Sequence, residues 1–182
     1  MFHGSSHYLS LEAAHEYVDS IKSKKSGIEL LTINADSLDP QTILDTLTSQ
    51  NLFVSERILF IKRLYKNKKK DDLISTLIEI LDSSTSKDNL VIWEDQKIKS
   101  NTKYYKFFNK TNDVENYDEL NKRTFFTWLR EELKKHGMKM EAVATKDIAE
   151  RTNYNPERCA NELKKLKLLL DDKEIKKDRT FS

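Results

Sequence analysis

Glycine, proline and cysteine are all scarce in this sequence, with three, two and one residues among 182. So few glycines argue against a glycine-rich phosphate loop, and so few turn residues argue against a β-sandwich. The single cysteine, Cys159, has no partner for an intrachain disulfide and no second thiol for a metal site. We therefore expect Cys159 to be buried and to pack as a small apolar side chain. The sequence also lacks a signal peptide and any run near the roughly 18 apolar residues of a membrane helix. We therefore expect a cytoplasmic protein with no membrane partner.

An excess of charge of one sign is also missing, because 32 basic residues face 30 acidic ones. Any affinity for nucleic acid must therefore come from a local patch. The strongest patch is the basic run 62–70, which comprises Lys62, Arg63, Lys66, Lys68, Lys69 and Lys70. It is suited to contacts with nucleic-acid phosphates or an acidic partner, but taken alone the pattern favours a solvated loop.

Short apolar runs recur along the first two thirds of the chain and predict strands. Three are nearly continuous, and two weaker ones flank them: 28–33, 57–64 and 90–93, with 1–3 and 114–117. Continuous apolar runs are typical of strands buried on both faces, as in a parallel sheet.

Amphipathic patterns between these runs predict helices over 10–21, 39–47, 71–81 and 104–108. Ser10 is the expected N-cap of the first helix, and Tyr17 is expected on its buried face beside Val18. Strands and helices thus alternate, which predicts a parallel α/β sheet.

Beyond residue 119 the strand signal stops and three helical patterns follow, over 125–133, 145–152 and 156–170. Gly137 is placed to end the first of these helices, and Asn155 is placed to cap the last. These helices predict a small all-α domain.

Residues with catalytic potential are few, and each has a structural explanation. The loop after the first strand, 3–8, has one glycine and no lysine, so it lacks a phosphate-binding pattern. We expect His3 and His7 to be loop or surface residues, because no third ligand lies near them. Four carboxylates follow strand ends, where helix capping and turn formation explain them best: Asp36, Asp39, Glu94 and Asp95. We therefore expect no catalytic residue, no metal, no cofactor and no ATPase activity.

Leu52 and Phe53 lie between a predicted helix and a predicted strand, within an otherwise polar connection. Two large apolar residues in such a place often pack into the core, which the pattern favours. The alternative is an exposed hydrophobic plug for the pocket of a partner.

Several segments together resemble one family, the delta subunit of the bacterial DNA polymerase III clamp loader. They are Asn51–Leu59, Asn89–Glu94 with Lys99 and Lys103–Lys106, Trp128–Arg130 with Lys135–Gly137, and Asn161–Leu166. The matches follow the order of the family and span nearly the whole chain.

The resemblance implies a fold and a domain organisation. Residues 1–118 would form an AAA+-like α/β domain, a parallel sheet flanked by helices that has lost its ATP site. Residues 119–174 would form a three-helix lid domain, and 175–182 a disordered tail. The collar domain through which the family assembles its pentamer has no counterpart in this sequence.

The resemblance also implies a function: a non-catalytic subunit of the DNA polymerase III holoenzyme, a nucleotidyltransferase complex, in the replisome at the nucleoid. The subunit would bind and open the sliding clamp, with Leu52 and Phe53 inserted into a hydrophobic pocket of the clamp. Further partners would be other clamp-loader subunits, for which the collar is missing, and primer–template DNA through the complex. The alternative from the residues themselves is a free-standing α/β nucleic-acid-binding protein that uses the basic run 62–70.

Overall fold

The structure is a computed structural model that describes residues 1–25, 27–49, 56–83 and 88–170. The chain divides into two compact units, Met1–Asp118 and Glu119–Ser182. None of the helices within the described residues has the length and apolar character needed to cross a membrane.

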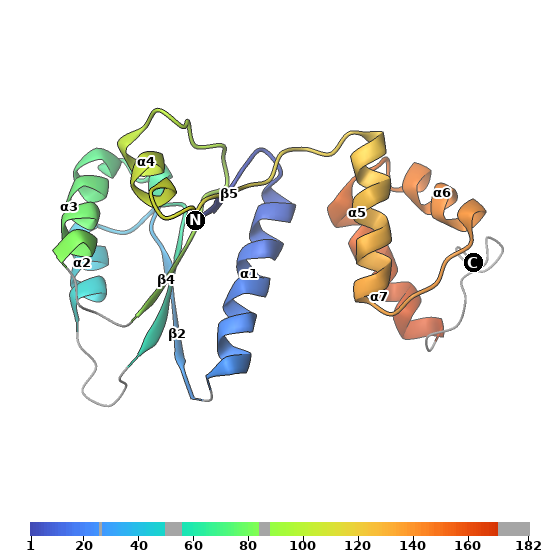
Figure 1. Cartoon of the computed structure of the whole chain (residues 1–182), viewed down its shortest axis with the longest axis horizontal. Helices are drawn as coiled ribbons and strands as arrows, with labels where there is room; N and C mark the ends of the chain where they lie inside the picture. The colour runs from blue at the N-terminus through green and yellow to red at the C-terminus, as the bar shows by residue number, and fades with distance from the viewer. Residues whose placement is uncertain (26, 50–55, 84–87, 171–182) are drawn as a thin grey trace. The chain divides into compact units, whose positions relative to one another are not determined.

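The first unit is built on a five-stranded sheet in which every pairing is parallel (Figure 1). The strands are β1 (Phe2–His3), β2 (Glu29–Asn34), β3 (Arg57–Lys62), β4 (Asn89–Trp93) and β5 (Glu115–Asn116), in the spatial order β2-β3-β4-β1-β5. Each of the five predicted strands is present. The expectation that 28–33 is buried on both faces is wrong, because β2 forms an edge of the sheet and buries only Ile33.

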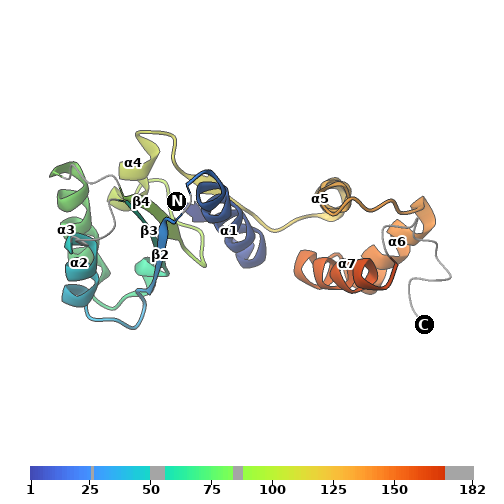
Figure 2. The same ribbon diagram turned by 90° about the horizontal axis from the view of Figure 1, so that it is seen from below.

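Helices cover both faces of this sheet (Figure 2). On one face, α1 (His7–Lys24) packs with Val18 and Ala14 against Phe60 and Val91. On the other face lie α2 (Pro40–Thr48), α3 (Lys70–Ser83), α4 (Lys103–Asn109) and the short 3-10 helix η1 (Leu64–Lys66). The two cores, one on each side of the sheet, explain why β3 is buried along almost its whole length.

Helix α1 is present with Val18 buried as predicted, but Ser10 and Tyr17 have other positions than the sequence predicted. The N-cap is Ser6, and Ser10 is a buried residue within the helix whose hydroxyl accepts a hydrogen bond from Trp93 Nε1 at 2.9 Å. Tyr17 is 49% exposed rather than buried, although its ring contacts that of Phe2. The buried stripe therefore runs through Ser10, Ala14 and Val18, because a serine that bonds a core tryptophan can replace an apolar residue.

The loop from β1 to α1 passes so close to the segment after β5 that it requires a glycine. Gly4 has φ +151°, and a Cβ at this position would lie 1.9 Å from the carbonyl oxygen of Tyr117. Two backbone hydrogen bonds hold this approach, from Ser6 N to Tyr117 O at 3.0 Å and from Tyr117 N to His3 O at 2.8 Å.

We expect Gly4→Ala to lower the free energy of unfolding by about 2–3 kcal/mol, because the methyl group strains the backbone and separates these two segments. The matched control is Gly27→Ala, since Gly27 also has a positive φ, +80°, but has open space around the new methyl group. It should cost about 1 kcal/mol. Urea unfolding of both variants measures the difference, and equal losses would contradict the close approach.

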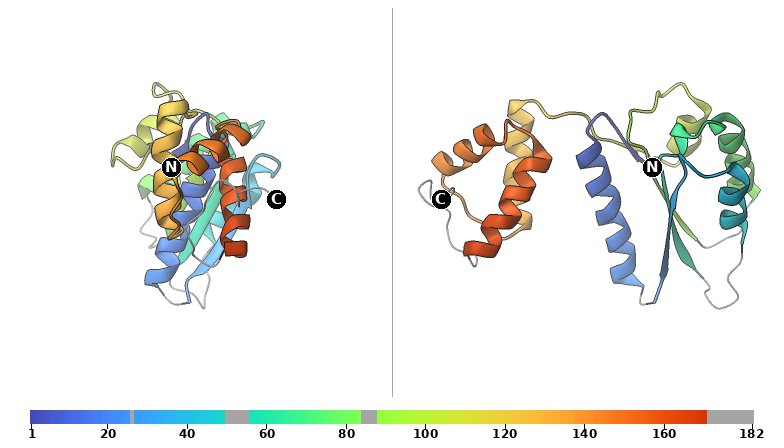
Figure 3. Two further views of the ribbon diagram at one scale, coloured as in Figure 1. Left: turned by 90° about the vertical axis from the view of Figure 1, so that its right-hand side faces the viewer. Right: turned by 180° about the vertical axis from the view of Figure 1, so that it is seen from behind.

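The second unit consists of three helices around one core (Figure 3): α5 (Lys122–Lys135), α6 (Ala142–Arg151) and α7 (Pro156–Leu170). Asn121 caps α5, and Gly137 follows it with φ +68°. Cys159 is buried in this core, as predicted, and burial raises the pKa of its thiol to about 12. Helix α6 begins three residues earlier than the predicted 145. The predicted disordered tail, 175–182, lies outside the described residues.

Candidate functional site

The carboxyl ends of parallel strands meet at one edge of a sheet, where α/β proteins usually bind their ligands. At this edge, polar residues follow four neighbouring strands. They are Asp36 after β2, Arg63 after β3, Glu94 and Asp95 after β4, and His3 at the end of β1.

Among these residues, Glu94 is fully buried. Its carboxylate accepts hydrogen bonds from the backbone N–H of Tyr65, at 3.0 and 3.1 Å, and from the Tyr104 hydroxyl at 2.7 Å. The rings of the two tyrosines stack 5.9 Å apart. Burial raises the pKa of Glu94 to about 7, against the lowering effect of these hydrogen bonds. Glu94 therefore joins β4 to η1 and α4. This agrees with the helix capping and turn formation that the sequence favoured for this carboxylate.

The raised pKa of Glu94 predicts a pH dependence of stability. The unfolded chain releases this proton near pH 4.5 and the folded chain near pH 7, so the free energy of unfolding should fall as pH rises between these values. Relative to Glu94→Gln, which does not titrate, the wild type should lose about 3 kcal/mol across this window and nothing further above it. Urea unfolding of both proteins at several pH values tests this, and a constant difference would show that Glu94 does not titrate in the window.

The basic run 62–70 also faces this edge, but much of its charge is paired. Three ion pairs join it to the acidic residues of the same edge: Arg63–Asp36 at 3.4 Å, Lys66–Asp95 at 2.6 Å and Lys69–Asp39 at 3.4 Å. Lys70 lies over the Tyr65 ring, and Lys62 lies over the Phe60 ring. Lys68 is exposed, with no partner in the part of the chain that the structure describes. Asp39 also caps α2 through the N–H of Gln41, as predicted.

In the loop after β1, where a phosphate loop would lie, one backbone amide is already bonded within the chain. The N–H of Ser6 donates to Tyr117 O, so this amide is not free to bind a phosphate oxygen. His3 is buried rather than on the surface, so that part of the prediction is wrong, whereas His7 is exposed. The His3 Nδ1 accepts from Ile98 N at 3.1 Å, and burial lowers the pKa of this imidazole.

No group of three or more metal-ligating side chains occurs among the described residues. The polar groups of this edge that do make hydrogen bonds, such as those of Glu94 and His3, join neighbouring elements at the strand ends.

A second polar cluster lies at the opposite edge of the sheet, around Arg57 at the start of β3. Its guanidinium is buried, and its Nη2 and Nε contact Asp88 Oδ2 at 2.8 and 3.3 Å. The backbone N–H of Arg57 donates to Asp88 Oδ1 at 2.8 Å, and its Nη1 donates to Ser49 Oγ at 3.4 Å. Arg57 thus joins the end of α2 to the starts of β3 and β4.

This cluster holds both ends of the connection between α2 and β3. Ser49 closes α2 and Arg57 opens β3, and their side chains are in contact. Leu52 and Phe53 belong to this segment and lie outside the described residues. The choice between a core position and an exposed plug therefore stays a prediction. The sequence analysis did not single out Arg57 as a site residue. The available signal was Asp88, an acidic residue at the equivalent position before the neighbouring strand β4.

A family model and several solved structures relate the chain to known proteins. The sequence model of the family described as DNA polymerase III, delta subunit, matches residues 4–118, nearly the whole first unit. Among curated proteins, none matches significantly.

Solved structures extend the likeness over both units. The Bacillus subtilis DNA clamp loader delta protein (YqeN) matches with a TM-score of 0.68 and 17% identity, over 96% of this chain and 55% of that protein. The Thermotoga maritima RuvB Holliday junction branch migration motor matches with a TM-score of 0.55 and 14% identity, over 99% and 60%. Domain III of the T. maritima replication initiation protein DnaA matches with 0.51 and 15%, over 92% and 75%.

These likenesses confirm the predicted fold class, an AAA+-like parallel sheet flanked by helices and followed by a small helical domain. The chain spans just over half the length of the B. subtilis protein.

Proposed function

The chain belongs to the DNA polymerase III delta subunit family, and from this premise we propose that it binds the sliding clamp and stabilises its open form during DNA replication. The family match over residues 4–118 is the observation that carries the proposal. Leu52 and Phe53 are the proposed anchors, inserted into a hydrophobic pocket of the clamp.

Such a mechanism needs no chemistry by this chain. Burying one leucine and one phenylalanine contributes roughly 3–6 kcal/mol before the costs of association are subtracted. A subunit that binds the open ring more tightly than the closed ring shifts the ring toward the open form by the ratio of the two affinities. ATP energy would come from neighbouring motor subunits.

Two features of the described residues support this assignment. The Ser6 amide, in the place of a phosphate loop, is already bonded to Tyr117 O, in keeping with a subunit that leaves ATP to its neighbours. The buried Arg57 guanidinium holds both ends of the connection that carries the proposed anchors. A connection fixed at its base loses less conformational freedom on binding than one whose ends move independently.

The wider partners follow from the same premise. We propose that the chain meets other clamp-loader subunits and, through the complex, primer–template DNA within the replisome at the nucleoid. Residues 62–70 are proposed as electrostatic support for these contacts. Three of the six basic side chains are in ion pairs within the chain, whereas Lys68 is exposed and has no partner among the described residues.

The direct test is titration of the immobilised sliding clamp of the same organism with the whole chain, in the absence of ATP. We expect saturable binding with one chain per ring interface. Absence of binding at micromolar concentrations would overturn the proposed function.

The alternative, a free-standing nucleic-acid-binding protein, predicts affinity for DNA or RNA by the chain alone that falls steeply with salt. The ion pairs of the basic run lower the charge it can offer to phosphates. Fluorescence anisotropy with a labelled duplex at two salt concentrations separates the two functions.

A further inference from the structure

The segment 96–112, which carries α4, has charge of one sign only. It contains five lysines and no acidic residue, and all five lysine side chains are exposed: Lys97, Lys99, Lys103, Lys106 and Lys110. Such a segment attracts a polyanion if its charge is not neutralised within the chain. The arrangement of the lysines and their acidic neighbours therefore decides what the segment binds.

Four of these lysines form a row along one side of α4. Lys103, Lys106 and Lys110 follow one another at helical spacing, and Lys110 at the C-cap keeps helical dihedral angles. Residues at this spacing lie on one face of a helix, and at 1.5 Å per residue the row from Lys103 to Lys110 is about 10 Å long. Lys99 is held just before the helix, because its carbonyl oxygen accepts a hydrogen bond from Thr102 N at 3.1 Å. Lys99, Lys103, Lys106 and Lys110 together make up the lysine row.

The other side of α4 is aromatic and faces the core. Tyr104 is fully buried, and Phe107 and Phe108 pack against the core on this face of the sheet. Tyr105 is half-buried, with its ring against that of His3. The exposed side of the helix therefore offers ammonium groups rather than rings on which nucleobases stack.

The first three lysines of the row keep their charge free. Within the part of the chain that the structure describes, Lys99, Lys103 and Lys106 form no ion pair. Lys97, which is outside the row, is paired with Asp118 at 2.8 Å. Three positive charges of the row are thus available to a partner.

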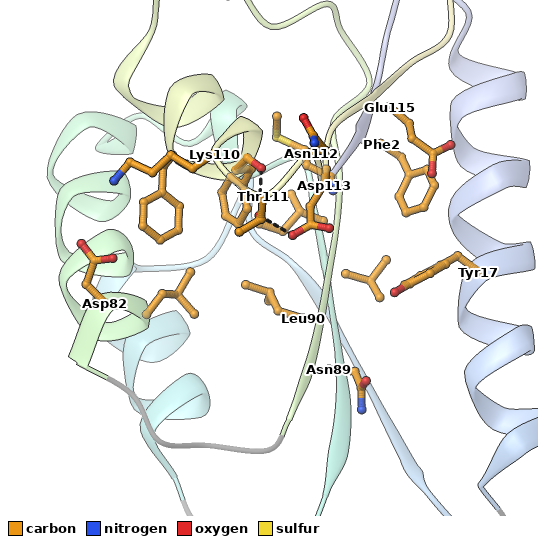
Figure 4. Close-up of a pocket in the computed structure, with 16 residues that line it drawn as sticks. Phe2, Tyr17, Asp82, Asn89, Leu90, Lys110, Thr111, Asn112, Asp113 and Glu115 are labelled. Carbon is orange, nitrogen blue, oxygen red and sulfur yellow. Dashed lines mark hydrogen bonds between the residues drawn. The ribbon is translucent and has the colours of Figure 1, made fainter.

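Acidic side chains accompany only the end of the row. Asp113 accepts a hydrogen bond from the Thr111 hydroxyl (Figure 4). Asp82 of α3 lines the same cavity as Lys110, and Lys110 also lies over the Phe107 ring. The charge of Lys110 is therefore partly offset, and the start of the row is its more positive part.

The basic run 62–70 differs from the lysine row, because acidic residues surround the run. Its ion pairs reach Asp36, Asp39 and Asp95, and two exposed acidic residues follow it directly, Asp71 and Asp72. The free positive charge of the first unit therefore lies more on α4 than on the run.

A row of ammonium groups fits the backbone of a nucleic acid. Along one strand of a duplex the phosphates follow one another every 3.4 Å of helix axis, so a row of about 10 Å spans about three of them. Lysine neutralises phosphates as a point charge and reads no base edge here. Because no stacking surface lies beside the row, it favours a duplex over a single strand.

We propose that the lysine row of α4 binds the phosphate backbone of duplex DNA without sequence preference. That the polyanion is DNA rests on the proposed function, whereas the position of the surface rests on the charges of α4. The start of α4 lies at the carboxyl edge of the sheet, where Tyr104 bonds Glu94. The connection with the proposed clamp anchors begins and ends at the opposite edge, at Ser49 and Arg57. One chain can therefore hold the clamp and DNA together.

The test is fluorescence anisotropy of a labelled duplex titrated with the whole chain at several salt concentrations. We expect micromolar binding in about 50 mM salt, equal for two unrelated sequences, and a slope of log affinity against log salt of about −3. This slope corresponds to the three to four phosphates that the row neutralises.

The double variant Lys103→Gln, Lys106→Gln should weaken DNA binding about tenfold and reduce the steepness of the salt dependence by about two. The matched control is Lys22→Gln, Lys24→Gln, which removes the same charge from exposed positions on α1, on the other face of the sheet. It should bind DNA within about twofold of the wild type. Both variants should unfold at the wild-type temperature, because glutamine and lysine have similar helix propensities.

Clamp binding of the Lys103, Lys106 variant, measured without DNA, should equal that of the wild type, so this inference and the proposed function fail independently. Three results would overturn the inference: no DNA binding at about 100 μM chain in low salt, equal losses in the α4 and α1 variants, or a duplex displaced equally well by polyglutamate of the same charge. The last result would assign the row to an acidic protein. A larger loss from Lys68→Gln, Lys69→Gln than from the α4 variant would also contradict it and would place DNA binding in the run 62–70.

Discussion

Replacing both Leu52 and Phe53 by alanine should weaken binding to the sliding clamp at least about 100-fold. The reason is the apolar area that the two side chains lose from the interface, since about 3 kcal/mol corresponds to that factor in the dissociation constant. Titration of the immobilised clamp with the wild type and with the double variant measures the effect.

The control is the double variant Leu168→Ala, Leu169→Ala on α7. These leucines are 85% and 78% exposed, so a similar loss of apolar side chain is made elsewhere on the chain. It should bind the clamp as the wild type does. The thermal stability of the Leu52, Phe53 variant decides its interpretation: if this variant unfolds, the two residues belong to the core and the plug assignment fails.

Removal of the Arg57 side chain should have the second large effect, on stability. We expect Arg57→Ala to lower the free energy of unfolding by about 3–5 kcal/mol, because it breaks a buried ion pair and leaves the largely buried Asp88 carboxylate without its guanidinium. It also removes the contact with Ser49 that joins α2 to β3. Urea unfolding measures the loss.

Arg57→Lys is the matched variant, because it keeps the charge but cannot reproduce the two contacts to Asp88 and the one to Ser49 together. It should lose roughly half as much stability as Arg57→Ala. If Arg57→Ala lowers the free energy of unfolding by less than about 1 kcal/mol, the Arg57–Asp88 pair contributes no more than a surface ion pair does. Arg57 then does not hold the connection between α2 and β3.

Much of this fold was predictable because its signals are local. The apolar runs at 57–64 and 90–93 are nearly uninterrupted, and they became β3 and β4 in the middle of the sheet. Asp39 followed by Pro40 marked the start of α2 through a cap and a fixed proline φ, both of which depend only on neighbouring residues.

The errors came where distant residues decide the outcome. Ser10 has the chemistry of a cap, but the indole of Trp93, 83 positions away, makes it a buried residue of α1. The run 28–33 has the composition of a central strand, yet its place at the edge depends on the strand order. His3 is buried because the short β1 passes between β4 and β5, which no local pattern reveals.

The candidate site divides in the same way. For Glu94 the sequence favoured helix capping and turn formation, and the structure gives its carboxylate hydrogen bonds from the Tyr65 N–H and the Tyr104 hydroxyl. Its raised pKa depends on burial beside Tyr104 and Tyr65, which come from other elements. Arg57 and Asp88 lie 31 positions apart and meet because β3 and β4 are neighbours in register. Arg57 is the first residue of β3 and Asp88 comes just before β4, and these matching positions of opposite charge were the available signal.

The most direct test of the proposed function is the state of the ring itself. A sliding clamp labelled with a fluorophore pair across one ring interface, mixed with excess chain without ATP, reports opening as a loss of energy transfer. We expect that loss with the wild type and with the Leu168, Leu169 variant, and no loss with the Leu52, Phe53 variant. A ring that stays closed while the wild-type chain is bound to it would contradict clamp opening by this subunit.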